Sequence, residues 1–141
     1  MAGWIIALIS GTLMSLQGVF NTEVTKQTSI WLSAGWVQLT AFLTCVVFWL
    51  FGDRQTVSLL FAVRPWYLLA GGLMGAFITW TVIKSMAALK PAQATLIIVV
   101  AQIVVSYLVE LMGLFGVDKA EFQWKKVLGA AVAVLGIFIF K

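Results

Sequence analysis

The stretch Ala92–Phe115, AQATLIIVVAQIVVSYLVELMGLF, decides the fold of this chain, because it is almost wholly apolar and carries a single charge, Glu110. A helix needs about 20 mostly apolar residues to cross the hydrocarbon core of a bilayer. In lipid a helix also satisfies its own backbone hydrogen bonds, whereas the alternation typical of a barrel strand is absent here. We therefore predict a membrane-spanning helix at residues 92–115.

Four more apolar stretches lie on either side of this one, at residues 4–20, 31–51, 66–86 and 124–140. Four of the five stretches open with tryptophan, which prefers the headgroup level of a bilayer. Polar segments separate them, the first being Asn21–Ile30. The sequence predicts an all-α, polytopic membrane protein with five transmembrane helices, in which residues 1–141 form a single transmembrane domain.

The composition supports this fold and excludes several functions. The chain is 62% hydrophobic and 10% charged, against roughly 45–50% and about 25% in soluble proteins. Its net charge of +4 is scattered over short loops, whereas a nucleic-acid-binding protein has a clustered basic face. There is no histidine, and Cys45 is the only cysteine. We therefore expect no nucleic acid, metal, cofactor or enzymatic activity.

The predicted topology has an odd number of spans, which bears on assembly. Basic residues are nearly balanced between the two sides, with five (Arg54, Arg64, Lys119, Lys125, Lys126) against four (Lys26, Lys84, Lys90, Lys141). This balance favours a cytoplasmic N-terminus only weakly and leaves insertion in both orientations open. Five helices scarcely enclose a pathway, so we expect a homodimer, with an antiparallel arrangement as one option, or pairing with a paralogue.

The most informative polar residues lie on the fourth span. Gln102, Ser106 and Glu110 are spaced four apart, which places them on one helix face within about 12 Å of rise. A carboxylate within a span is costly and is a functional candidate by default. Glu110 is predicted either to couple transport to protons or another cation, or to form a structural ion pair with Lys125 or Lys126.

A second set of polar residues is predicted to lie at one depth, in the half of the membrane away from the N-terminus. Tracing the spans up and down places Gln17, Gln38, Trp80 and Gln102 there. They are predicted to line a polar, aromatic-walled pocket for a small solute, together with Ser106. The alternative is that the amides only hold helices together. Asn21 is predicted to mark the end of the first helix.

Five ordered motifs carry a resemblance to a known family. They are Gln17–Asn21 (QGVFN), Gly71–Ala76 (GGLMGA), Leu89–Thr95 (LKPAQAT), Gln102–Gly116 (QIVVSYLVELMGLFG) and Trp124–Gly129 (WKKVLG). Together they closely resemble the YdcZ-type family of bacterial inner-membrane proteins, within the drug/metabolite transporter superfamily. Many relatives have aspartate at the position of Glu110 and glycine at that of Lys90.

This resemblance implies one five-span repeat of the transporter type, in a multi-pass protein of the bacterial inner membrane. The function we expect is a secondary transporter (permease) of a small organic solute or metabolite, working as a dimer by alternating access, with Glu110 as the candidate for proton coupling. The alternative is a scaffold or regulatory subunit that transports nothing. The resemblance assigns no residue roles.

Overall fold

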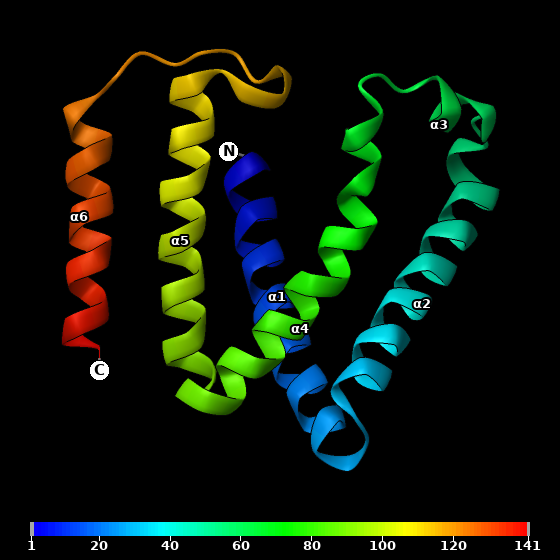
Figure 1. Ribbon diagram of the computed structural model, residues 1–141, viewed down its shortest axis with the longest axis horizontal. Helices are drawn as coiled ribbons and strands as arrows, with labels where there is room; N and C mark the ends of the chain where they lie inside the picture. The colour runs from blue at the N-terminus through cyan, green and yellow to red at the C-terminus, as the bar shows by residue number, and fades with distance from the viewer. Residues whose placement is uncertain (1, 141) are drawn as a thin grey trace. The chain divides into compact units, whose positions relative to one another are not determined.

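The computed structural model describes residues 2–140, and Figure 1 shows its ribbon. These residues form helices and no strand, which confirms the predicted all-α class. Their contacts divide the chain into two compact units, Met1–Ala87 and Ala88–Lys141. Each unit therefore has its own packing.

The first unit contains three long helices and three shorter helical segments. In chain order they are α1 (Ala2–Gln27), α2 (Ile30–Phe48), the π-helical turn η1 (Trp49–Asp53), the short α3 (Ser58–Ala62), the 3-10 turn η2 (Trp66–Ala70) and α4 (Gly71–Leu89). The spans predicted at residues 31–51 and 66–86 correspond to α2 with η1 and to η2 with α4. The last two residues of α4 already belong to the second unit.

The first helix is longer than the sequence predicted. The expected break at residues 21–30 is wrong, because α1 continues to Gln27 and only Thr28 and Ser29 connect it to α2. Asn21 accordingly lies within the helix and does not end it. The Ser29 side chain caps α2 by accepting a hydrogen bond from the backbone N–H of Leu32 at 3.2 Å.

The connection between α1 and α2 is held by a small polar core. The buried Ser33 hydroxyl of α2 donates to the backbone carbonyl of Asn21 at 3.0 Å. On α1, one turn earlier, Gly18 leaves room for α4, because a Cβ there would lie 2.5 Å from Met86 Cε and 3.3 Å from Val82 Cγ1. Small and polar residues thus permit close helix contact in a setting where apolar burial gives little drive for association.

Eight threonine hydroxyls of this unit bond to the backbone of the same helix, seven from within the helix and Thr28 from just past its end. Each donates to the backbone carbonyl four residues earlier: Thr12 to Leu8, Thr22 to Gly18, Thr25 to Asn21, Thr28 to Val24, Thr40 to Trp36, Thr44 to Thr40, Thr79 to Gly75 and Thr81 to Phe77. This pairing explains why polar residues do not interrupt the helices.

The second unit is an antiparallel pair of helices, α5 (Pro91–Met112) and α6 (Trp124–Ile139), which run side by side in Figure 1. Pro91 occupies the first turn of α5, as predicted, where the missing N–H breaks no helix bond. Gly113 ends α5 in the left-handed conformation, at φ 63°. A 3-10 turn, η3 (Leu114–Gly116), and a loop then lead to α6.

Four helical segments of the described chain are long and apolar enough to cross a membrane: Ala2–Gln27, Ile30–Gly52, Trp66–Leu89 and Pro91–Met112. The fifth predicted span is a helix as well, but α6 has only 16 residues. That length rises about 24 Å, less than the roughly 30 Å hydrocarbon core. The fifth crossing therefore stays a prediction.

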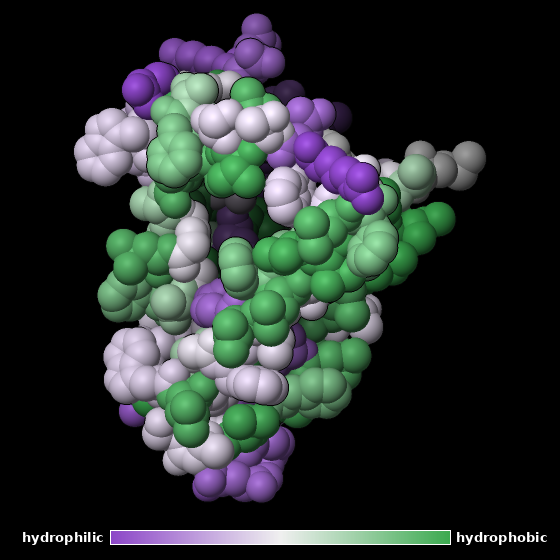
Figure 2. Space-filling view, turned by 90° about the vertical axis from the view of Figure 1, so that its right-hand side faces the viewer, coloured by the Kyte–Doolittle hydropathy of each residue, from purple (hydrophilic) through white to green (hydrophobic). Residues whose placement is uncertain are grey.

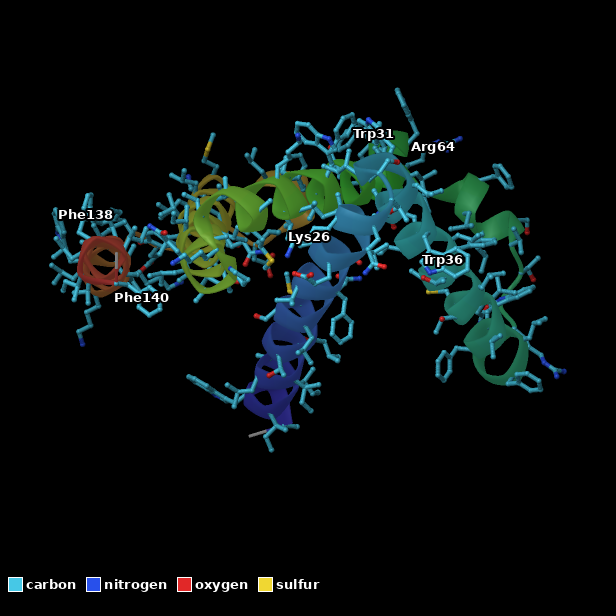
Figure 3. All side chains as sticks on the ribbon, turned by 90° about the horizontal axis from the view of Figure 1, so that it is seen from below. Lys26, Trp31, Trp36, Arg64, Phe138 and Phe140 are labelled. Atoms are coloured by element: carbon cyan, nitrogen blue, oxygen red, sulfur yellow. The ribbon has the colours of Figure 1, made fainter. Side chains whose placement is uncertain are left out.

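The outward surfaces suit contact with lipid. On the face that carries α2 and α3, Figure 2 shows hydrophobic residues over most of the area and hydrophilic residues toward its two ends. Large apolar side chains lie exposed on the helices, among them Trp36 of α2 and Phe138 of α6, as the sticks in Figure 3 show. In water such surfaces would promote association.

Candidate functional site

An open recess of about 390 Å³ lies between α5 and α6, and it is the strongest candidate site in the second unit. Its walls combine three polar side chains and a lysine with small and apolar ones: Ile103, Ser106, Tyr107 and Glu110 from α5, and Lys126, Gly129 and Ala130 from α6. The volume falls within the roughly 300–1,000 Å³ of small-molecule sites. The recess is therefore large enough for a small solute or part of one.

Opposite charges meet in this recess. Lys126 Nζ lies 2.8 Å from Glu110 Oε2, and the two side chains are 43% and 41% exposed. Of the two lysines that the sequence offered as partners, Lys126 is the one that pairs. Because the pair is half-exposed, other parts of the described chain cover the carboxylate only partly.

Tyr107 fixes the geometry of this pair from one turn earlier on α5. Its ring centroid lies 5.2 Å from Lys126 Nζ, within the range of a cation–π contact. Its hydroxyl accepts from the backbone N–H of Gln123 at 2.9 Å and donates to the Gln123 carbonyl at 3.4 Å. Gln123 is the N-cap of α6, so Tyr107 holds the start of the helix that carries Lys126.

The loop between the helices adds a second attachment at Glu110. The backbone carbonyl of Glu110 accepts from the N–H of Ala120 at 2.9 Å and from that of Gly113 at 3.3 Å. Sequence reasoning missed the role of Tyr107, although its position three residues before Glu110 places it on the same helix face.

The polar face predicted on α5 is only partly gathered at the recess. Ser106 and Glu110 line it, whereas Gln102 is exposed and lies outside its lining. Gln102 stands one turn before Ser106 on the same side of the helix. A role for Gln102 in binding solute remains a prediction.

The other predicted pocket residues belong to the first unit. Gln38 Nε2 donates to Thr79 Oγ1 of α4 at 3.5 Å, which links α2 to α4. Gly75 makes room for this amide, since a Cβ on it would lie 3.2 Å from Gln38 Nε2. Gln38 therefore forms the interhelical contact that was the alternative to a pocket role.

Trp80 lies in an aromatic cluster of the same unit. Its ring stacks on that of Trp31 with centroids 6.1 Å apart and an interplanar angle of 18°. Lys84 Nζ lies 6.0 Å from the Trp80 ring centroid. Gln17 of α1 is exposed. The pocket predicted from Gln17, Gln38, Trp80 and Gln102 needs residues of both units, and it stays a prediction.

Residues 2–140 contain no group of three histidine, cysteine, aspartate or glutamate side chains placed to hold a metal ion. The candidate site instead consists of one carboxylate, one ammonium group, two hydroxyls and an aromatic face.

Comparison with known proteins assigns the family. Residues 2–139 match the family described as "Putative inner membrane exporter, YdcZ". No curated protein and no solved structure matches the chain. The match covers nearly the whole chain, and the apolar helices agree with the location that the description gives. The chain therefore belongs to the YdcZ family of inner-membrane exporters and is a multi-pass protein of the inner membrane.

Proposed function

We propose that this protein is a secondary transporter that exports a small organic solute, and that the recess between α5 and α6 takes the charged part of that solute. The observation that carries the proposal is the half-exposed Glu110–Lys126 pair at 2.8 Å. An intramembrane carboxylate is retained at a cost, and it usually serves a pathway, a coupling ion or a partner. The direction of transport follows the description of the family.

The Glu110–Lys126 pair determines which chemical groups a solute needs in order to bind. A solute amine competes with the Lys126 ammonium for the Glu110 carboxylate, while apolar parts of the solute lie against Ile103 and Ala130. Lys126 stays beside the Tyr107 ring, 5.2 Å away, so its charge keeps a favourable contact when Glu110 changes partner. The site therefore favours a small amphipathic solute with a cationic amine.

Proton coupling uses the same carboxylate. A proton that binds Glu110 removes the negative charge that holds the solute amine, and the solute then leaves. When the proton dissociates, Glu110 binds a new solute or returns to Lys126. One proton thus exchanges for one solute cation, and the proton gradient drives export.

The energy source and the assembly are proposed from the sequence. The chain has no glycine-rich phosphate-binding loop with its lysine and Ser/Thr, so ATP hydrolysis is not the proposed source. Two copies, parallel or antiparallel, would surround the pathway and open it to alternate sides. In this arrangement Gln102, one turn before Ser106 on α5, is proposed to extend the polar lining of the recess.

The test begins with purified protein and a thermal-stability screen against small amines and metabolites, since a ligand that binds only the folded state raises apparent stability. Compounds that stabilise the protein are then loaded into proteoliposomes, and efflux is measured with and without a proton gradient. Glu110→Gln should abolish the acceleration by the gradient, and Glu110→Asp should retain part of it.

Glu23→Gln is the matched control, because Glu23 is a carboxylate in an exposed ion pair with Lys26 on α1, outside the recess. This variant should transport like the wild type. Equal gradient dependence in wild type and Glu110→Gln would contradict the coupling role. Co-purification with a stoichiometric partner of different sequence, without any solute flux, would favour the scaffold alternative.

A further inference from the structure

A second recess lies in the first unit, at the end of α2. It has a volume of about 650 Å³ and is open on one side. One wall comes from α2 and η1, with Phe42, Cys45, Val46 and Trp49, and the other from residues 55–63. None of the described lining residues is charged. The recess therefore suits a hydrocarbon chain better than a polar solute.

The segment that forms the second wall is held in place at its beginning. Trp49 Nε1 donates to the Gln55 carbonyl at 2.9 Å, which ties the start of the segment to η1. The segment then forms α3, whose Leu59 and Leu60 line the recess. Tryptophan at the end of a spanning helix marks the headgroup level, so the recess opens near the membrane surface.

Two arginines flank the second wall. Arg54 immediately precedes it, and Arg64 immediately follows it. Residues 54–65 contain no acidic residue. Asp53 precedes them, so residues 53–65 carry two arginines and one aspartate, with a net charge of +1. The rim of an apolar recess is therefore basic.

Both guanidinium groups keep hydrogen-bond donors free for a ligand. Arg54 uses Nε to bond the Leu50 carbonyl at 2.6 Å. Arg64 uses Nη1 to bond the carbonyls of Phe61 at 3.1 Å and Val63 at 3.0 Å. A guanidinium has five N–H donors, so each group is positioned by the backbone and retains donors for a phosphate.

We propose that this recess binds an anionic phospholipid of the surrounding bilayer, with an acyl chain along the apolar walls and the phosphate at Arg54 or Arg64, the arginines on either side of the second wall. Basic groups beside apolar clefts at membrane surfaces select anionic headgroups, at about a fivefold gain in affinity per arginine. The lipid would secure α3 against α2. This site is independent of the recess between α5 and α6.

Lipid competition followed by native mass spectrometry tests the proposal. Delipidated wild-type protein in detergent is offered equal amounts of phosphatidylglycerol and phosphatidylcholine. We expect retained phosphatidylglycerol to exceed phosphatidylcholine by about fivefold or more. Arg54→Gln/Arg64→Gln should bring this ratio close to one. Lys119→Gln/Lys125→Gln removes the same charge from the second unit and should leave the ratio unchanged.

A second measurement does not depend on a variant folding correctly. Cys45 is the only cysteine and lines the recess in an exposed position, so a bulky maleimide can fill the recess of the folded wild type. Loss of the retained anionic lipid after labelling supports the site. Equal retention of both lipids by wild type, or a preference that survives either the arginine substitutions or the labelling, would overturn it.

Discussion

Glu110 lies in a helix that is otherwise apolar, and its charge is met by a lysine from the neighbouring helix. The Lys126 side chain reaches it at 2.8 Å and lies beside the Tyr107 ring at the same time. An unpaired charge costs about 2.5–3.5 kcal/mol at the centre of a spanning helix and less toward its ends, and Glu110 lies two residues before the end of α5. At the scale of single residues, one ion pair therefore explains why the acid is tolerated.

Two substitutions of Tyr107 should distinguish the role of its hydroxyl from the role of its ring. Tyr107→Phe removes both hydrogen bonds to the Gln123 backbone and should cost about 1 kcal/mol of stability, measured as a lower unfolding temperature in detergent. Tyr107→Leu also removes the contact with Lys126 and should impair solute binding further. Equal behaviour of wild type and Tyr107→Phe would show that the hydroxyl does not hold α6.

At the residue scale, the sequence predicts which charged residue is of interest but does not predict which side chains are in contact. Glu110 is conspicuous as the single charge of its apolar stretch, and two lysines were within reach as partners. Tyr107 could not be distinguished from a packing aromatic, because its role depends on where the backbone of Gln123 lies. Gln38 could not be assigned either, since only the approach of α4 decides whether its amide meets Thr79.

At the scale of helices, apolar length predicts the existence of each long helix, whereas polar residues gave the wrong position for several helix ends. The polar composition of residues 21–27 suggests a loop, yet the hydroxyls of Thr22 and Thr25 donate to backbone carbonyls within α1. The Asn21 carbonyl also accepts a hydrogen bond from the Ser33 hydroxyl of α2. The turn η1 and the short α3 were not predicted. Apolar runs report burial in lipid, whereas helix ends depend on local hydrogen bonds that polarity alone does not reveal.

The end of α5 gives a prediction at this scale. Gly113→Ala should destabilise the second unit by about 1–2 kcal/mol, because its φ of 63° suits glycine and a new Cβ would lie 3.1 Å from Lys119 Cβ. Gly136→Ala is the control, since a Cβ there meets nothing within 4 Å. Unfolding in detergent measures both, and an undiminished unfolding temperature in Gly113→Ala would contradict the assignment of this turn.

For the whole molecule, the short α6 decides whether the chain crosses the membrane four or five times. If α6 crosses, residues 2 and 140 lie on opposite sides of the membrane. Ala2→Cys and Phe140→Cys, each made in a Cys45→Ala background, should then react with a membrane-impermeant maleimide from opposite sides. Reaction of both from the same side would show that the chain crosses four times.

The hydroxyls of the threonines on α1, α2 and α4 are already committed to carbonyls of their own helices, from Thr12 on α1 to Thr81 on α4. Such a hydroxyl has no proton left for a neighbouring helix and can only accept a hydrogen bond from one, as Thr79 does from Gln38. Helix flanks of this kind therefore present few hydrogen bonds that would have to break if one helix moved past another. Under the proposed alternating access, such movements would leave most of these side-chain bonds intact.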